Sequence, residues 1–192
     1  MSTHSSDLPF TGFTFSDAVS ALNISPAAYK ASHPSITGGL VVGAVVIVGN
    51  SPPRMLLIQR APSDGWPLDW ECPGGGVDAQ LDATLLQAVA RELSEESGLV
   101  AAHIEAVLDE YEFGDGGDRW RKITCLVRVK HDGRHDGPLP PVTLAPDEHC
   151  DYVWASEEEV RLAKCDGREI RFAYDGAVKQ IFVDALQRHG AV

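Results

Sequence analysis

The alternation of apolar and polar residues along the chain predicts both strands and helices. Two runs rich in valine, isoleucine and leucine, Gly38–Gly49 and Arg54–Arg60, have the composition of buried strands, and a Ser-Pro-Pro turn separates them. Further strands are expected at Ile104–Phe113, at Trp120–Val129 and near Cys150–Trp154. The glycine-rich stretch 114–118 is typical of the turn of a hairpin between the first two of these.

A central helix is predicted after the Pro-Gly-Gly-Gly stretch 73–76. Its apolar stripe has the spacing i, i+3, i+4 and i+7 and consists of Leu86, Val89, Ala90 and Leu93. Thr84 and Gln87 have the spacing of a capping box, and Gly98 suits a left-handed C-terminal cap. The other helices are expected at Ser16–Leu22, at Pro26–Ser32 with Ser25 as N-cap, after Ser156, and at about Asp175–His189. The last would bury Val178, Ile181, Phe182, Ala185 and Leu186.

This order of elements implies an α/β fold in which helices cover both faces of a mixed sheet. At 192 residues the chain fits one main domain, expected at 38–192, preceded by an N-terminal extension, 1–37, with a loose tail and two short helices. A glycine- and proline-rich segment, 131–147, is expected to be a long loop.

Charge and composition exclude several classes of function. The formal net charge of −12 disfavours binding to nucleic acid polymers or anionic membranes, which need basic patches. The apolar run Leu40–Val48 is too short to cross a bilayer, and Met1–Pro9 lacks the apolar core of a signal peptide. The four cysteines form no C-x-x-C pair, so reduced thiols and a cytoplasmic location are expected.

The candidate chemistry lies in residues 73–99. Glu92, Glu95 and Glu96 have i, i+3 and i+4 spacing and should project from one side of the helix, beside its apolar stripe. Carboxylates crowded near the protein body need a counter-charge, and an oxygen-only cluster favours magnesium, calcium or manganese over zinc. A glycine turn before the helix allows its backbone to approach a metal ion or a phosphate closely.

The segment Arg91-Glu92-Leu93-Ser94-Glu95-Glu96-Ser97-Gly98-Leu99 resembles the second half of the Nudix box, G-x5-E-x7-R-E-U-x-E-E-x-G-U, where U is a bulky aliphatic residue. Trp70–Gly75 resembles the strand that leads into this box. Glu148-His149 with Trp154 resembles the late Glu-His…Trp segment of diadenosine-polyphosphate hydrolases. The resemblance implies a Nudix-type α/β/α sandwich over residues 38–192.

The first half of the box departs from the pattern. Its glycine and glutamate positions fall on Val77 and Ala83, because the loop before Arg91 is two residues longer than the consensus. Asp82 is the better substitute for the missing glutamate and Asp78 the weaker one. In the family this glutamate supports the loop and the helix, so altered loop geometry and an altered substrate fit are expected.

The resemblance also implies roles for the matching residues. The carbonyl of Gly74 would hold Mg²⁺ or Mn²⁺ together with the side chains of Glu92, Glu95 and Glu96, and Arg91 would orient these carboxylates. The bound ions would activate a water molecule against phosphorus. The general base would be Glu95 or Glu148, because family members differ in which glutamate acts as the base.

Other residues have a functional and a structural interpretation. Arg60, Trp66, Gly75 and Tyr111 are candidate substrate contacts. For the aromatic side chains, which also include Phe113 and Trp120, packing in the core or the hairpin competes with stacking on a base. Surface ion pairing competes with phosphate binding for Arg60 and Arg121, and Glu157–Glu159 suit the first turn of a helix. His149 is interpreted as a structural hydrogen-bonding residue rather than a ligand.

Three functions are therefore considered. The first is Mg²⁺-dependent hydrolysis of a phosphoanhydride bond in a small nucleotide-like or organic diphosphate. The second is a sensor that binds a nucleotide without cutting it. The third is an enzyme that resembles isoprenoid diphosphate isomerases, which would need a catalytic cysteine, and Cys72 is the candidate. The oligomeric state stays open, a homodimer included.

Overall fold

The structure is a computed structural model that describes residues 12–49, 51–130, 139–173 and 177–190. Most of the predicted N-terminal tail, the first half of the predicted loop 131–147 and the predicted helix start at Asp175 lie outside these residues. The elements are β1 (Thr14–Phe15), η1 (Asp17–Leu22), α1 (Pro26–Ser32), β2 (Leu40–Val48), β3 (Arg54–Arg60), β4 (Trp70–Glu71), α2 (Leu85–Ser97), β5 (Ala101–Asp115), β6 (Asp118–Val129), β7 (His149–Ala155), α3 (Glu157–Leu162), β8 (Lys164–Cys165), β9 (Arg168–Glu169) and α4 (Ala177–Gly190).

The sheet is mixed, as predicted. Over the described residues it has seven strands in the order β1–β5–β6–β2–β3–β4, and β7 pairs with β3. β2 runs parallel to β6, with Val42 opposite Ile123, whereas the β5–β6, β2–β3 and β3–β7 pairs are antiparallel. The β5–β6 hairpin turns at Gly116 and Gly117, whose positive φ angles of 59° and 91° suit a tight primed turn.

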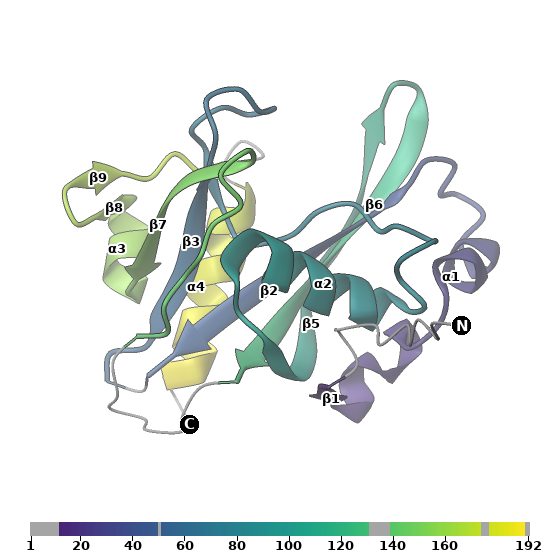
Figure 1. Ribbon diagram of the computed structural model, residues 1–192, viewed down its shortest axis with the longest axis horizontal. Coiled ribbons are helices and arrows are strands. Elements are labelled where there is room, and N and C mark those ends of the chain that lie inside the picture. The colour runs from purple at the N-terminus through teal and green to yellow at the C-terminus, as the bar shows by residue number, and fades with distance from the viewer. Residues whose placement is uncertain (1–11, 50, 131–138, 174–176, 191–192) are drawn as a thin grey trace, which may run out of the picture.

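Helices cover both faces of the sheet and give the predicted α/β/α sandwich (Figure 1). An apolar core lies on each side of the sheet. One face packs against α2, which buries Leu86, Val89 and Leu93. The other face packs against α4 through Phe182 and Leu186, and α3 lies beside α4. The predicted apolar face of α4 differs in one position, since Val183 is buried and Ile181 is only partly so. Among the described residues, no helix is long and apolar enough to cross a membrane.

The N-terminal segment 12–37 packs onto the same core as α2. Val19, Leu22, Tyr29 and Ile36 are each at most 5% exposed and belong to this core. The segment also adds β1 to the sheet as a parallel partner of β5. Helix α1 begins as predicted, with the side chain of Ser25 accepting a hydrogen bond from the N–H of Ala28.

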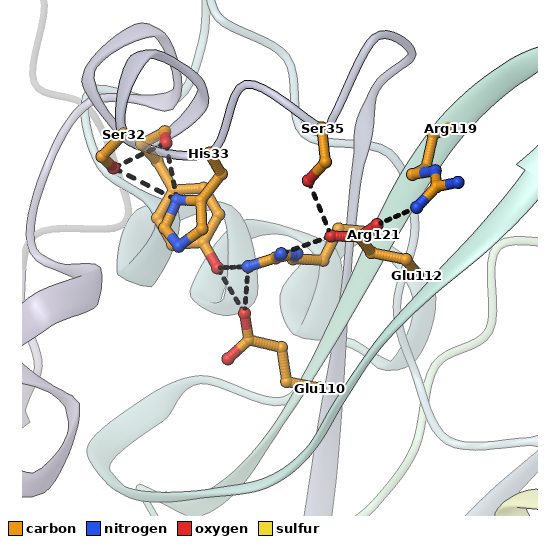
Figure 2. Close-up of polar contacts among 8 residues, drawn as sticks. Ser32, His33, Ser35, Glu110, Glu112, Arg119 and Arg121 are labelled. Carbon is orange, nitrogen blue, oxygen red and sulfur yellow. Dashed lines mark hydrogen bonds and ion pairs between the residues drawn. The ribbon is translucent and has the colours of Figure 1, made fainter.

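A polar cluster fixes α1 to the β5–β6 hairpin (Figure 2). The guanidinium of Arg121 donates to Glu110 at 2.7 Å, to Glu112 at 2.5 Å and to the hydroxyl of Tyr29 at 3.1 Å. Ser35, in the segment after α1, donates to Glu112 at 2.9 Å. Arg121 therefore takes part in an ion-pair network, which agrees with the structural interpretation of this residue.

Candidate active site

A glycine-rich turn lies between strand β2 and helix α2. The carbonyls of Pro73 and Gly75 accept hydrogen bonds from backbone N–H groups of β2, at 2.7 and 2.9 Å. Because successive residues of an extended segment point their polar groups in opposite directions, those of Gly74 face away from β2. The N–H of Gly74 accordingly donates to the carboxyl group of Glu96 on α2 at 2.6 Å.

Two glycines of this turn are required by close approach. A Cβ atom added at Gly74 would lie 2.2 Å from the carbonyl oxygen of Val42. One added at Gly75 would lie 2.6 Å from Oε2 of Glu92, whereas one at Gly76 would meet nothing within 4 Å. The bare backbone at 74 and 75 thus allows the turn to lie directly against β2 on one side and the acids of α2 on the other.

Helix α2 is capped by Thr84 and Gly98, as predicted, but only half of the predicted capping box forms. The side chain of Thr84 accepts a hydrogen bond from the N–H of Gln87, whereas the side chain of Gln87 accepts from the N–H of Ala83. Gly98 is left-handed with φ 70°. The helix places Glu92 and Glu96 toward the protein body, 7% and 4% exposed. The side chain of Glu95 is 49% exposed, and Arg91 contacts both Glu95 and Glu92. Glu92 and Glu96 are therefore the two buried acids of α2.

Arg91 is the centre of a buried ion-pair network. Its Nε and Nη2 donate to the two carboxylate oxygens of Asp82, each at 2.9 Å, and Nη1 donates to Glu95 at 2.7 Å. Nη2 also donates to the carbonyl of Gly76 and lies 2.9 Å from Glu92. The hydrogen bonds with Asp82 are the main reason that the pKa of Arg91 is raised. Arg91 therefore ties the long loop, the glycine turn and the acidic helix together.

Asp82 occupies the supporting position that the sequence assigned to it as the better substitute for the missing glutamate. It is 2% exposed, and its Oδ2 also accepts a hydrogen bond from the N–H of Asp78 at 2.8 Å. Asp78 itself is exposed and its side chain bonds only locally, to the N–H of Gln80. The two additional loop residues are accommodated because Asp82 reaches Arg91 from within the longer loop.

Burial perturbs the two inward-facing acids of α2. Desolvation raises the pKa of Glu92 to about 7, although Arg91 opposes this shift. Desolvation raises the pKa of Glu96 to about 9, and the nearby charges of Glu71, Glu92 and Glu148 add to it. Both carboxyl groups are thus short of positive charge, which is the condition that a divalent cation relieves.

Glu148 and His149 approach these acids from the segment that leads into β7. Ligand atoms of Glu96, Glu148 and His149 all lie within 4.8 Å of one another. His149 is 2% exposed, and neither of its ring nitrogens has a hydrogen-bond partner. Its Nδ1 lies 4.0 Å from Oε1 of Glu96, and its Nε2 lies 3.8 Å from Oε1 of Glu71.

A further buried acid, Glu71, lies behind this group. It is 2% exposed and is bonded by Arg60, which also binds Asp64 at 2.5 Å and the carbonyl of Gly65. Burial alone would raise the pKa of Glu71, but contacts with His149, Lys122 and Arg60 outweigh it, and the pKa is lowered. Glu71 therefore stays ionised beside the candidate site. The guanidinium of Arg60 is largely committed to these protein groups.

The remaining predicted substrate residues lie at different places. Trp66 is 48% exposed on the loop between β3 and β4, with a positive φ of 57°. Tyr111 is partly buried on β5, opposite Lys122 of β6. Gly75 lies in the glycine turn beside the acids. The structure therefore brings Gly75 next to the acidic group, while Trp66 and Tyr111 lie on separate elements.

The aromatic residues of the hairpin and the glutamates 157–159 make the structural contacts that were expected of them. Trp120 packs against Phe113, with ring centroids 6.4 Å apart, and lies so close to Gly38 and Gly39 that added Cβ atoms would lie 2.5 and 2.3 Å from it. The three glutamates 157–159 form the first turn of α3. Glu157 pairs with Arg161, and Glu159 completes a capping box with Ser156.

Sequence reasoning missed Glu71 and Lys122. Both are buried, at 2% and 4% exposure, and both lie in strands, β4 and β6. The available signal was a charged residue between two apolar ones, Trp70 and Cys72, directly before the glycine turn. An ion in the middle of a buried strand is rare unless it is paired, so such a position merits attention as part of a site.

The residues fit a divalent cation. The acids of α2 offer oxygen ligands and are short of counter-charge, and the glycine turn leaves backbone polar groups next to them. The buried nitrogens of His149 make no hydrogen bond to any residue that the structure describes. This arrangement could bind an ion and, through it, the oxygens of a phosphate chain.

Comparisons with known proteins agree with this geometry. The family model described as NUDIX domain matches residues 39–173. A sequence comparison with curated proteins gave no match. Similar solved structures include the NUDIX domain of Shewanella oneidensis NrtR complexed with ADP ribose (TM-score 0.60, 22% identity, 90% of this chain and 98% of that one). Others are a Caenorhabditis elegans Ap4A hydrolase (0.55, 19%, 79% and 99%) and a MutT NUDIX hydrolase from Burkholderia pseudomallei (0.54, 21%, 76% and 95%).

Proposed function

Because the chain belongs to the Nudix hydrolase family, we propose that it cuts a phosphoanhydride bond in a small nucleotide-like or other organic diphosphate, with Mg²⁺ or Mn²⁺ as cofactor. The observation that carries this proposal is the pair of buried acids, Glu92 and Glu96, held against the glycine turn with pKa values raised to about 7 and 9. Two acids with such pKa values are costly to ionise in the protein alone, and an ion coordinated between them offsets that cost.

The residues divide into ligands and positioning residues. Glu92 and Glu96, with the carbonyl of Gly74, would hold the ion. Arg91 acts as a positioning residue, because its guanidinium contacts Glu92 and anchors the loop through Asp82. Glu95 is held by Arg91 at the exposed edge of the helix, where it can reach an ion only from the solvent side. The bound ion supplies positive charge to the phosphate oxygens and lowers the pKa of a coordinated water.

Glu95 and Glu148 remain the two candidates for the general base. Glu148 is exposed and its carboxylate lies within 4.8 Å of Glu96 and His149. Glu95 instead accepts a hydrogen bond from Arg91 at 2.7 Å through one oxygen, and it does not belong to that group of ligand atoms. This difference favours Glu148. If Glu148 is the base, Glu148→Gln lowers kcat at least a hundredfold, and Glu95→Gln lowers kcat less.

The decisive experiment is a panel of phosphoanhydrides incubated with Mg²⁺ or Mn²⁺, with the products resolved by chromatography. ADP-ribose and diadenosine tetraphosphate belong in the panel because similar structures bind or act on them. Glu96→Gln should fold and lose most turnover. Glu158→Gln, which changes an exposed acid of α3, is the matched control and should retain it. Cleavage of no compound by the wild type, or full activity of Glu96→Gln, contradicts the proposal.

The two alternatives make different predictions. A sensor would bind a nucleotide such as ADP-ribose, the ligand in the NrtR domain complex, without releasing product. An isomerase would need a reactive cysteine, but Cys72 is 3% exposed and burial raises its pKa to about 12, so its thiol stays protonated. Cys72→Ala is therefore expected to leave hydrolysis largely intact.

A further inference from the structure

The imidazole of His149 is almost fully buried, with a carboxylate about 4 Å from each nitrogen but no hydrogen bond at either. Its exposure is 2%, and neither Nδ1 nor Nε2 makes a hydrogen bond within the described residues. A buried polar group that makes no hydrogen bond destabilises the folded state. Such a group is expected where its partner is an ion or molecule that binds at the site.

The surroundings of Nδ1 match the spacing of ligands on one ion. Nδ1 lies 4.0 Å from Oε1 of Glu96, and Glu148 offers a third ligand atom within 4.8 Å of both residues. With metal–ligand distances of about 2.2 Å, two ligand atoms are about 3.1 Å apart when adjacent and about 4.4 Å apart when opposite. Small side-chain shifts are therefore enough for these three residues to share an ion.

The other nitrogen faces a carboxylate. Nε2 lies 3.8 Å from Oε1 of Glu71, which Arg60 holds in place. A histidine that binds a metal usually donates the N–H of its second nitrogen to a carboxylate or carbonyl, which fixes the ring and the tautomer. His149 is arranged in this way, with Glu71 beside Nε2 and Glu96 beside Nδ1.

We propose that His149 is a nitrogen ligand of the metal site, together with Glu96 and Glu148, and that this site therefore prefers a divalent transition ion over Mg²⁺. The inference rests on the proposed function only in placing the ion beside Glu96. Glu148 binds through one carboxylate oxygen, and its second oxygen can still accept a proton. An imidazole favours transition ions because Mg²⁺ binds almost only oxygen and keeps much of its water.

The test uses the full chain with Mn²⁺ as the probe and pulsed electron paramagnetic resonance as the readout. We expect ¹⁴N hyperfine coupling to bound Mn²⁺ in the wild type, and its loss in His149→Gln. The same variant should bind Mn²⁺ at least tenfold more weakly, with Mg²⁺ affinity changed less than threefold. His103→Gln is the control, because that imidazole bonds the hydroxyls of Thr14 and Ser16, and it should keep the coupling.

Selective ¹⁵N labelling of histidine tests the unsubstituted chain, so the inference does not depend on the variant folding. The label should replace the ¹⁴N signal by a ¹⁵N signal. Bound Mn²⁺ without a nitrogen coupling, or a coupling that persists in a folded His149→Gln, overturns the inference. If the inference is overturned but the wild type still hydrolyses a phosphoanhydride, the proposed function stands without His149 as a ligand. If neither Mn²⁺ nor Mg²⁺ binds the wild type, both fail.

Discussion

The pair between Asp82 and Arg91 offers a quantitative test of how the long loop is supported. Asp82→Asn removes one charge and converts an acceptor oxygen into an N–H donor that faces Arg91 or the N–H of Asp78. The two side chains are 1% and 7% exposed, so solvent cannot replace the lost contacts. Removing one partner from a buried ion pair typically costs about 3–5 kcal/mol.

The expected loss is at the lower end of this range, about 3 kcal/mol, because Glu92 and Glu95 still neutralise Arg91. For a chain of this size the melting temperature should fall by about 6–12 °C, which differential scanning calorimetry measures. Asp78→Asn is the matched control, and it should change stability by less than about 0.5 kcal/mol because Asp78 is exposed. Equal effects of the two substitutions, or a loss below about 1 kcal/mol for Asp82→Asn, would refute the assignment of Asp82 as the supporting acid.

Three further predictions concern the glycine turn, the buried acids and the N-terminal segment. Gly75→Ala should weaken Mg²⁺ binding at least tenfold in a titration, because its Cβ would lie 2.6 Å from Glu92. Gly76→Ala places its Cβ in open space and should leave Mg²⁺ binding unchanged, so equal effects of the two substitutions would contradict the steric argument. Without metal, the unfolding free energy should fall as pH rises from about 5 to 9. The pKa values of Glu92 and Glu96 are about 7 and 9 in the folded state and about 4.5 in the unfolded state. The folded state therefore binds more protons in this pH range. Urea unfolding in EDTA at several pH values measures this slope, which Glu96→Gln should flatten; an unchanged slope in that variant contradicts it. Arg121→Gln should destabilise the chain by about 2 kcal/mol in the same assay, and Arg128→Gln, whose ion pair is exposed, by less than about 0.5 kcal/mol; equal losses would show that the cluster does not fix α1.

The elements of the fold could be predicted because apolar periodicity and capping residues act locally. Helix α2, with Thr84 and Gly98 at its ends, and the strands on either side of it were all found in this way. Family membership and the α/β/α fold, both predicted from the half-box at 91–99, are confirmed. Short elements such as β1 and β8 were missed because two residues carry no periodicity, and η1 was predicted only as an undifferentiated helix.

The candidate site was less predictable because it depends on contacts between distant segments. The helical period makes Glu95 the acid farthest from the apolar stripe, so its exposure follows from helix geometry, whereas the contacts of Glu92 and Glu96 with the glycine turn do not. The approach of His149 to Glu71 and Glu96 joins residues 78 and 53 positions apart, which no local pattern encodes. Charged residues inside strands, such as Glu71, were the signal that was left unused.

The packing of residues 12–37 has a practical consequence for anyone who trims the gene to the matched range 39–173. Such a fragment would lack Val19, Leu22, Tyr29 and Ile36 on one face of the sheet, and the whole of α4 on the other. Both faces would then present bare apolar surface to water, and the fragment should aggregate on expression. The half-box at 91–99 is thus short, but in this chain the segments that cover both faces of the sheet lie partly outside the matched range.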